Sequence, residues 1–459
     1  MEKYDVLVVG GGPGGIIAGM TAAEKGLKTI IFERGRKCGE KNASGVGLVP
    51  KIWRDFRDIM KEMDLPSQRI SRKSTAHLCD HNGEVLCEFT WTPTALYDYK
   101  EAREFMVVMV YRSQFDHWLS QYAVNAGAEL KTSTLIVDVL RDDDGKIIGV
   151  VDENGKKYTG VIIGADGAVS TIAHKSGIRH KFGPNETTLV VNYDFEAPEK
   201  KIDEIIGDNC LHNWFSPIYP ATFNFFKKDG FHIGLGQWYG AIDQNLMVYL
   251  NRVVKSPPVA RLIKILNAKP REVHAHALPW QQFPLTTYGE NIMLIGDAAG
   301  FPCPLEAEGI WHAMYSGRLA ALNAAEAIEK GDFSKEQMKK YEDAWINSPL
   351  GDEFIAGKEL QEFWANLSFN MNNIGKVIDL TNNILNIFTG ATSHVEITRK
   401  IFHDIRDRSA ELTPMMRQFV MPFFAKVFEK ELEDMSSVMQ MVNKLADDLR
   451  PKDKDRRKK

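Results

Sequence analysis

The feature that most constrains this 459-residue chain is a glycine-rich turn near its start, GGGPGG at residues 10–15. A short apolar run, residues 4–9, precedes the turn, and an Ala-rich segment of helical character, residues 14–25, follows it. Residues 28–33 (KTIIFE) are a second apolar run that ends in an acidic residue. A buried strand, a glycine turn, a helix and another strand within about thirty residues predict a Rossmann-type β-α-β unit.

Each glycine of this GxGxxG pattern has its own physical task. Gly10 permits the tight turn from strand to helix, Gly12 lets a pyrophosphate approach the bare backbone, and Gly15 lets the helix pack close to the strand. Glu33 ends the second strand, where a carboxylate can accept bonds from both hydroxyls of an adenosine ribose. The pattern predicts a nucleotide site made of Gly10, Gly12, Pro13, Gly14, Gly15 and Glu33.

The composition is that of an ordinary globular protein, with 44% hydrophobic and 26% charged residues and a formal net charge of −4. This balance offers no basic field, so we expect no nucleic-acid partner. The five cysteines are scattered without a CxxC pair, which argues against disulfides and an internal iron–sulfur cluster, and we expect no metal site. The chain's start leaves no room for a signal peptide, and no stretch approaches about 18 consecutive apolar residues, so we expect a cytoplasmic protein.

Two later segments each end an apolar run. Residues 163–170 (IGADGAVS) resemble the GADG segment of flavin monooxygenase-type proteins, and residues 294–300 (LIGDAAG) resemble the second flavin motif of that superfamily. The resemblance implies that the nucleotide is FAD, with Asp297 on the ribityl hydroxyls. It also implies that the helix that follows aims its positive end at the N1–C2=O edge of the flavin, where reduction builds negative charge. The implied contacts are Asp166, Gly167, Gly296, Asp297, Gly300, Gly309 and Ile310.

A more specific resemblance lies around residues 33–45, where ERG and GEKNASG are similar to the ERG…GxKNxxGG stretch of FixC and the electron-transfer-flavoprotein:quinone oxidoreductases. Residues 111–119 (YRSQFDHWL) are similar to the LRxxFDxWL helix of those proteins, and residues 331–350 match the spacing of their DFS…Y…SxL region. The resemblance covers roughly residues 1–180 and 287–365. It implies that Arg112 lies beside the FAD and that Lys41, Asn42, Ser44 and Gly45 line the dinucleotide side of the flavin, with Arg34 as a further contact.

Some departures from that family widen the choice of function. Members that reach quinone alone carry a C-terminal ferredoxin-like cysteine set, which this chain lacks, as FixC-type subunits do. Residues 38–40 (CGE) resemble a segment of archaeal geranylgeranyl reductases, a neighbouring branch with the same flavin fold. The segment at residues 301–310 is also more acidic than the usual glycine-rich version.

We therefore expect an FAD-dependent oxidoreductase. The resemblance favours a FixC-like role, in which electrons pass from an electron-transfer flavoprotein or a ferredoxin-like donor through FAD to a quinone. The second hypothesis is a geranylgeranyl reductase-type enzyme, which saturates isoprenoid double bonds of lipids with a flavin hydride and a proton from an acid. An aromatic hydroxylase and a non-enzymatic electron-relay subunit of a complex are further alternatives. The candidate acids, each expected to be structural more often than catalytic, are Cys38, Glu306, Glu308 and His312.

The predicted fold class is α/β, with three parts. A Rossmann-type FAD-binding domain, like those of flavin monooxygenases and glutathione reductase, is followed by a C-terminal helical region and interrupted by a mostly antiparallel β substrate domain. The FAD-binding domain comprises residues 1–75, 105–180 and 287–340, the substrate domain residues 76–104 and 181–286, and the helical region residues 341–459.

Local patterns refine this outline. Residues 106–126 contain a predicted helical stretch, VYRSQFDHWLSQYAVNA, with one buried face made of Phe115, Leu119 and Ala123. DG at residues 144–145 and NG at residues 154–155 predict hairpin turns. An apolar seam at residues 428–449 is expected to pack on its own protein, with dimerisation and peripheral contact with a membrane surface as alternatives. Three aromatic side chains are expected either to wall an apolar pocket or, as an equal alternative, to pack in the core: Trp214, Phe225 and Trp238.

Overall fold

A computed structural model describes residues 1–40, 47–61, 64–92, 105–280, 284, 286–304, 307–368, 371, 374–375 and 378. The chain divides into two compact units, Met1–Asn382 and Asn383–Lys459. Every described residue belongs to the first unit. The apolar seam at residues 428–449 therefore lies outside the described residues, and its expected packing on its own protein stays a prediction, as do the alternatives of dimerisation and membrane contact.

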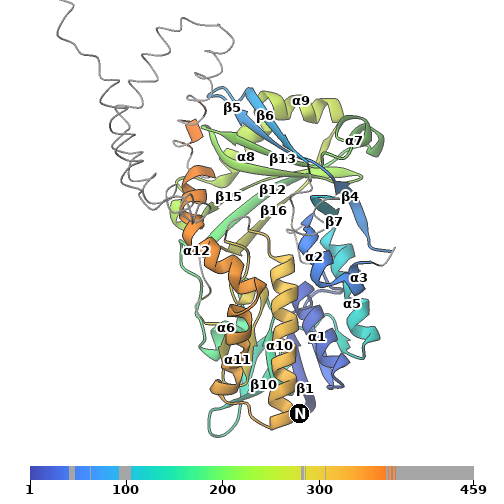
Figure 1. Ribbon diagram of the computed structural model, residues 1–459, viewed down its shortest axis with the longest axis vertical. Helices are drawn as coiled ribbons and strands as arrows, with labels where there is room; N and C mark the ends of the chain where they lie inside the picture. The colour runs from blue at the N-terminus through green and yellow to red at the C-terminus, as the bar shows by residue number, and fades with distance from the viewer. Residues whose placement is uncertain are drawn as a thin grey trace, which may run out of the picture. The chain divides into compact units, whose positions relative to one another are not determined.

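An eight-stranded sheet forms the centre of one half of this unit (Figure 1). Strands β18, β11, β1, β2 and β8 are parallel neighbours in that order, and β17, β10 and β9 join them by antiparallel pairs. All of β2 and β18 is buried, as expected of parallel strands that are covered on both faces. The strands are β1 (Glu2–Val9), β2 (Thr29–Phe32), β8 (Glu129–Lys131), β9 (Ile136–Arg141), β10 (Ile147–Asp152), β11 (Lys157–Gly164), β17 (Tyr288–Gly289) and β18 (Ile292–Leu294).

The two predicted hairpins are confirmed. Strand β10 pairs antiparallel with both β9 and β11. The connecting turns contain Gly145, with φ 83°, and Gly155, with φ 76°. These left-handed conformations are the ones that a tight hairpin turn requires and that glycine adopts without strain.

The helical stretch predicted within residues 106–126 is confirmed, but the residues before it form a strand that was not predicted. Val107–Val110 is strand β7, and helix α5 spans Arg112–Asn125. The run VVMV is rich in β-branched residues and pairs with β3 (Gly47–Leu48) and β4 (Ser67–Ser71) in a small three-stranded sheet, which helical periodicity alone does not reveal. The predicted buried face of the helix is confirmed, because its three residues are fully buried: Phe115, Leu119 and Ala123.

A separate seven-stranded sheet has the order β16-β12-β15-β14-β13-β5-β6. All of its pairs are antiparallel except β13 with β5. Helices α7 (Glu199–Ile205), α8 (Leu246–Lys255) and α9 (Pro257–Leu266) cover one of its faces and share a hydrophobic core with it (Figure 1). The strands are β5 (Ser74–Cys79), β6 (Val85–Trp91), β12 (Thr187–Glu196), β13 (Leu211–Ser216), β14 (Tyr219–Phe226), β15 (Gly230–Trp238) and β16 (Lys269–Pro279).

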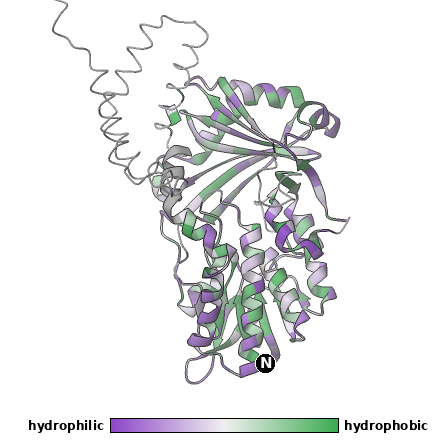
Figure 2. Ribbon diagram, in the orientation of Figure 1, coloured by the Kyte–Doolittle hydropathy of each residue, from purple (hydrophilic) through white to green (hydrophobic). Residues whose placement is uncertain are grey.

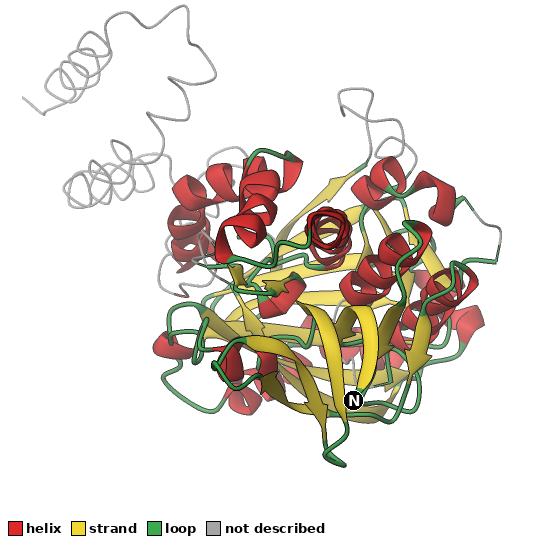
Figure 3. Cartoon of the chain, turned by 90° about the horizontal axis from the view of Figure 1, so that it is seen from below, coloured by secondary structure: helices red, strands yellow, loops and turns green. Residues whose placement is uncertain are grey.

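Helices pack against the strands of the eight-stranded sheet (Figure 3). Helix α1 (Pro13–Glu24) lies against α10 (Ile310–Lys330), and a Cβ atom at Gly317 of α10 would lie 2.3 Å from the carbonyl oxygen of Gly14. The two helices therefore approach each other as closely as their backbones allow. The other helices are α2 (Pro50–Asp55), α3 (Arg57–Met60), α6 (Thr171–Ser176), α11 (Lys335–Ile346) and α12 (Pro349–Ser368), with short 3-10 helices η1 (Tyr239–Ala241) and η2 (Gly296–Ala298).

Hydropathy follows this layering. The central strands of the eight-stranded sheet are hydrophobic, whereas the surrounding helices mix hydrophobic and hydrophilic residues (Figure 2). Within the part of the chain that the structure describes, no helix combines the length and the hydrophobicity that crossing a bilayer requires. The parallel Rossmann-type sheet with a separate, mostly antiparallel sheet confirms the predicted fold class. The domain boundaries drawn from the sequence stay a prediction.

Candidate cofactor site

The carboxyl ends of four parallel strands bring the predicted cofactor segments to one edge of the eight-stranded sheet. Val9 of β1 pairs with Phe32 of β2 and with Gly164 of β11, and Gly164 pairs with Leu294 of β18. The chain segments that follow these residues therefore leave the sheet in one row. Open α/β sheets bind their ligands at this edge, just beyond the strand ends.

The glycines at this edge differ in what surrounds them. Gly10 has φ 113°, and a Cβ atom there would lie 2.2 Å from the carbonyl oxygen of Ala165. At Gly15 a Cβ atom would lie 1.9 Å from the carbonyl oxygen of Gly10. At Gly12 and Gly167, in contrast, it would meet no described atom within 4 Å. Two of the glycines are thus required by the packing of the chain itself, and two leave space open beside the backbone.

The start of α1 suits an anion. The helix begins directly after Gly12 with Pro13 at its first position, and no described side chain caps it. An uncapped helix start offers backbone N–H groups and the positive end of the helix dipole. Together with the open space at Gly12, this arrangement fits the pyrophosphate of FAD.

Glu33 is fixed beside the glycine turn. Its two carboxylate oxygens accept hydrogen bonds from the amides of Gly11 at 3.0 Å and Gly35 at 2.6 Å, and the side chain is buried. Cys38 lies on the same side of Gly11 as Glu33, because a Cβ atom at Gly11 would be 2.7 Å from its Sγ and 3.0 Å from Glu33 Oε2. Burial, with a contribution from Glu33, raises the pKa of Cys38 to about 12. The adjacent Arg34 is exposed.

Arg112 begins α5 and is held by a buried carboxylate. Its Nε and Nη2 donate to the two oxygens of Asp116 at 2.7 and 2.8 Å, and Asp116 is fully buried. Burial opposes the charge of the guanidinium, but Asp116 and, more weakly, Asp297 and Glu308 outweigh it and raise the pKa of Arg112. Arg112 is therefore within electrostatic reach of the second flavin motif.

Asp166 supports the protein's own backbone. One of its oxygens accepts from the Ser170 hydroxyl at 2.6 Å and the other from the amide of Ile172 at 3.0 Å. Ser170 in turn accepts from the amide of Ala173 at 2.9 Å. The two side chains together cap the N-terminus of α6, and burial raises the pKa of Asp166 against these hydrogen bonds.

Replacing Ser170 by Ala should lower the free energy of unfolding by about 1 kcal/mol, the usual cost of losing a helix cap. The retention of FAD should not change, because the hydroxyl points to the start of α6. Urea unfolding and flavin fluorescence measure the two quantities. If FAD were lost as well, the cap formed by Ser170 and Asp166 would also shape the cofactor site.

Asp297 lies in η2, just beyond β18, and faces the second sheet. Its Oδ2 is 3.9 Å from Nε2 of His276 in β16, and its Oδ1 would be 3.6 Å from a Cβ atom at Gly309. His276 therefore reaches the second flavin motif from the antiparallel sheet. This contact could not be predicted from the sequence, because the alternation HAH at residues 274–276 only places both histidines on one face of a strand.

Strand register decides which aromatic residues share that face. Phe225 pairs with His232 of β15, and Trp238 lies on the same side of β15 as His232. Strand β12 pairs with both β15 and β16, and its register places His276 of β16 on this side of the sheet too. Trp214 has the opposite orientation: it stacks on His77, with ring centroids 4.5 Å apart, in the core beneath α7, α8 and α9. Of the two expected roles, Trp214 therefore has the core role and not the pocket role, because side chains alternate along a strand.

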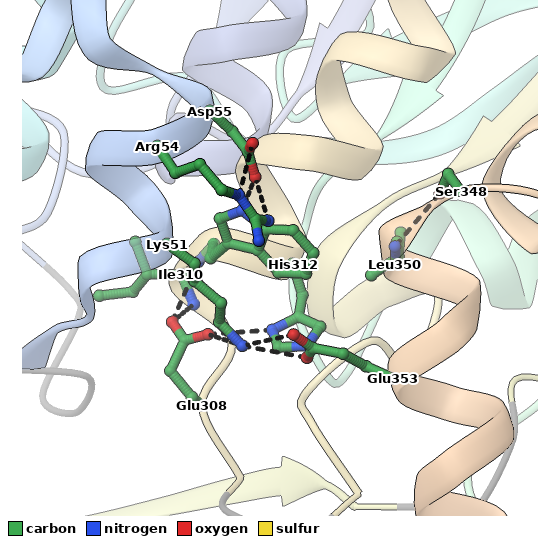
Figure 4. A network of polar contacts seen from close by, with 10 residues as sticks. Lys51, Arg54, Asp55, Glu308, Ile310, His312, Ser348, Leu350 and Glu353 are labelled. Atoms are coloured by element: carbon green, nitrogen blue, oxygen red, sulfur yellow. Dashed lines mark hydrogen bonds and ion pairs between the residues drawn. The ribbon is translucent and has the colours of Figure 1, made fainter. Parts of the chain in front are cut away.

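The start of α10 is occupied by a side chain of the chain itself (Figure 4). Glu308 Oε1 accepts from the amides of Ile310 at 2.7 Å and Trp311 at 3.0 Å. Its Oε2 accepts from His312 Nδ1 at 3.0 Å, and His312 Nε2 donates to Glu353 at 2.6 Å. The amides that the resemblance assigns to the flavin edge thus already have an anionic partner.

Three side chains in this region lie close enough together to bind a metal ion. Cys303, His312 and Glu353 offer donor atoms within 4.8 Å of one another. Both imidazole nitrogens, however, are hydrogen bonded to carboxylates. A doubly protonated imidazole has no lone pair for a metal, so these contacts describe an ion cluster.

Most of the predicted residues that the structure describes lie at one edge of the sheet, and their contacts with a cofactor stay predictions. The glycine turn at residues 10–15 lies beside Glu33, and Asp297 lies beside Gly309, whereas Asp166 caps a helix. Gly296 and Gly300 flank Asp297 in left-handed conformations, with φ 54° and 83°. The remaining predicted residues lie outside the described ones: Lys41, Asn42, Ser44, Gly45 and Glu306.

Comparison with known proteins agrees with this geometry. Residues 5–191 match the family described as FAD dependent oxidoreductase. Protein FixC of Azorhizobium caulinodans is 27% identical over 384 residues, which cover 79% of this chain and 83% of FixC. Digeranylgeranylglycerophospholipid reductase of Methanospirillum hungatei is 29% identical over 379 residues, which cover 80% of this chain and 87% of the reductase.

Solved structures share the fold. A geranylgeranyl bacteriochlorophyll reductase-like protein of Thermoplasma acidophilum has a TM-score of 0.70 at 23% identity, over 89% of this chain and 99% of that one. The halogenase PltM, solved in complex with FAD, has a TM-score of 0.59 at 16% identity, over 89% of this chain and 96% of that one. The chain is an FAD-dependent oxidoreductase related to both FixC and the digeranylgeranylglycerophospholipid reductases.

Proposed function

We propose that this protein has a FixC-like role and passes electrons from an electron-transfer flavoprotein or a ferredoxin-like donor through FAD to a quinone. The observation that supports this role most is the protonation state of the described candidate acids. Saturating a carbon–carbon double bond needs a positioned acid that protonates carbon. Reducing a quinone places two protons on oxygen atoms, which exchange protons readily with water.

None of the candidate acids that the structure describes suits protonation of carbon near neutral pH. The thiol of Cys38, with a pKa of about 12, is buried beneath the glycine turn. Hydrogen bonding to His312 and the nearby charge of Lys51 outweigh burial and lower the pKa of Glu308. The pKa of His312 is raised to about 10. Each group keeps its proton or its charge throughout the neutral range.

The chain's own residues have binding and orienting roles in this proposal. The start of α1 holds the pyrophosphate, Glu33 the adenosine ribose and Asp297 the ribityl chain. Bound FAD supplies the redox chemistry, because it accepts two electrons and releases them to an acceptor. Gly12 is essential because it leaves the backbone open to the phosphates.

The acceptor is assigned to the face of the antiparallel sheet that bears Phe225, Trp238 and His276. Aromatic rings suit the flat apolar head of a quinone. The imidazole of His276, next to Asp297 and about one-third exposed, offers a hydrogen bond to a quinone oxygen. The proposal includes a peripheral membrane contact through the C-terminal segment, since quinones reside in the bilayer.

The second candidate is reduction of isoprenoid double bonds in lipids. The relatedness to digeranylgeranylglycerophospholipid reductases and the position of His276 favour it. In that reaction His276 is the described group best placed to deliver a proton next to the flavin. The two candidates therefore differ in what His276 does.

Anaerobically photoreduced protein should be reoxidised rapidly by a menaquinone analogue and should leave a geranylgeranyl lipid in the same micelles unchanged. Flavin absorbance and mass spectrometry of the lipid measure the two outcomes. The variant His276→Gln should retain electron transfer to the quinone. A lipid that gains two hydrogen atoms, with loss of this activity in His276→Gln, would establish the second candidate in place of the first.

A further inference from the structure

Four ionisable side chains from separate segments meet at the N-terminus of α10 (Figure 4). Lys51 comes from α2, Glu308 from the loop before α10, His312 from the first turn of α10 and Glu353 from α12. His312 is fully buried, and the side chains of Lys51 and Glu308 are 8% and 9% exposed. We call this set the α10 cluster.

Cations and anions alternate in the α10 cluster. Lys51 Nζ donates to both carboxylate oxygens of Glu353 at 3.0 Å and lies 3.8 Å from Glu308 Oε2. His312 bridges the two carboxylates, at 3.0 Å from Glu308 and 2.6 Å from Glu353. Two positive and two negative groups cancel, so the cluster has no net charge as a whole, and each charge has a partner in a region of low dielectric constant.

The four groups stay ionised near neutral pH. Burial and the charge of Lys51 disfavour the protonated imidazole, but hydrogen bonds to Cys303, Glu308 and Glu353 outweigh them and raise the pKa of His312 to about 10. Burial raises the pKa of Glu353, yet His312 and Lys51 outweigh it and lower that pKa to about 2. The pKa of Glu308 falls for the same reasons. The carboxylate of Glu308 is thus a fixed negative charge.

Glu308 also touches the end of the helix. Its Oε1 accepts from the first amides of α10, those of Ile310 and Trp311, while its Oε2 faces the rest of the cluster. The same carboxylate, like Asp297, influences the guanidinium of Arg112 across the site. Glu308 therefore joins the cluster to the edge of the sheet where the cofactor segments converge.

We propose that Glu308 lowers the reduction potential of the bound FAD by holding a fixed negative charge at the N-terminus of α10. The inference rests on the placement of FAD proposed above. Reduction adds negative charge to the flavin, and a nearby carboxylate makes that addition less favourable. The helix dipole acts in the opposite direction, so the Glu308 carboxylate offsets a helix end that would otherwise favour the reduced cofactor.

His312 and Lys51 are positioning residues in this arrangement. They keep Glu308 ionised and hold one of its oxygens, so that the other stays on the helix end. A lone glutamate at this depth would tend to take up a proton and lose its charge. The cluster explains how the acidic Glu308 is accommodated in a segment where the resemblance to flavin-binding proteins favours glycine.

The test is a redox titration of purified holoprotein against reference dyes, with FAD retention measured by fluorescence. In Glu308→Gln, which keeps the shape and removes the charge, the ratio of the affinities for reduced and oxidised FAD should rise at least tenfold, or about 30 mV for a two-electron couple. Glu308→Asp should stay close to the wild type, because it keeps the charge. Glu326→Gln, near the far end of α10 and exposed, is the matched control and should not change the potential.

A second variant gives the opposite sign. Lys51→Gln removes a positive charge from the cluster and should lower the potential, which keeps the inference testable even if Glu308→Gln retains FAD poorly. An unchanged potential in FAD-loaded Glu308→Gln, or equal shifts in the Gln and Asp variants, would overturn the inference. Reoxidation by quinone is a separate readout, so failure of the proposed electron acceptor would not be confused with failure of this inference.

Discussion

The variant Gly12→Ala should fold as stably as the wild type but lose FAD, whereas Gly15→Ala should lose both stability and FAD. The two glycines are three residues apart in the same turn, yet the surroundings of their Cβ positions differ completely. The pair therefore separates the glycine that the ligand requires from the glycine that the fold requires.

The backbone conformation at position 12 does not require glycine. Its φ of −79° and ψ of 176° lie in the extended region that any residue adopts. A methyl group there would meet no described atom, and the loss of backbone freedom in the unfolded chain should even stabilise the fold by about 0.4–1 kcal/mol. The methyl group would stand where the pyrophosphate is expected. Losing about two charge-assisted hydrogen bonds should weaken FAD binding by about a hundredfold.

Gly15 has no such freedom. A Cβ atom there would lie 1.9 Å from the carbonyl oxygen of Gly10 and 3.2 Å from the Cβ atom of Ala165, so α1 would have to move away from β1. Backbone displacement in the middle of the core belongs to the most costly class of substitutions, at more than about 4 kcal/mol.

Urea unfolding of FAD-free protein and fluorescence titration with FAD measure the two effects separately. Gly12→Ala with wild-type FAD affinity would show that the phosphates do not pass over residue 12. Gly15→Ala with wild-type stability would contradict the close packing of α1 on β1. The first result would require another position for the cofactor on this sheet edge.

What could be predicted from the sequence was governed by local chemistry. The glycine turn, the two hairpins and the buried face of α5 depend on neighbouring residues, and the structure contains all of them. The position of Glu33 and Asp297 at one edge of the sheet could also be predicted, because each follows a parallel strand and parallel strands end at one edge. The strand at residues 107–110 was missed because its partners are distant in sequence.

The features that escaped prediction depend on packing between distant segments. Lys51 and Glu353 are separated by 302 residues, and only the meeting of α2 with α12 brings them together. The side of the sheet on which Trp214 lies depends on the register of β13 with β5 and β14. The contact of His276 with Asp297 depends on the position of β16 opposite η2, which local sequence patterns do not determine.

Replacing His312 by Gln should lower the free energy of unfolding by about 3–5 kcal/mol at pH 5.5, the usual cost of breaking a buried ion pair. The buried imidazolium faces two carboxylates, and a neutral amide in its place would leave Glu308 and Glu353 with Lys51 as their shared cation within the cluster. His117→Gln, on the exposed side of α5, is the matched control and should change stability by less than about 0.5 kcal/mol.

The size of this loss should depend on pH in a direction set by the pKa values. The pKa of His312 is about 10 in the folded protein and 6.5 ordinarily, so its contribution to stability is complete below pH 6.5 and is lost as the pH rises towards 10. The pKa of Glu353 is about 2 instead of 4.5, so its contribution is complete above pH 4.5 and is lost as the pH falls towards 2. Both contributions are therefore complete between pH 4.5 and 6.5.

Urea unfolding at saturating FAD, at pH 5.5, 7.5 and 9.5, would measure the difference between the wild type and His312→Gln. The difference in the free energy of unfolding should be largest at pH 5.5 and should shrink steadily to pH 9.5. Above pH 6.5 the imidazole of His312 stays protonated in the folded wild type but loses its proton in the unfolded chain, so each further rise in pH favours unfolding of the wild type. A difference that stays constant over this range would mean that His312 is neutral in the folded protein. The carboxylates of Glu308 and Glu353 would then lack the imidazolium that holds them ionised, and the fixed charge at the start of α10 would lose its physical basis.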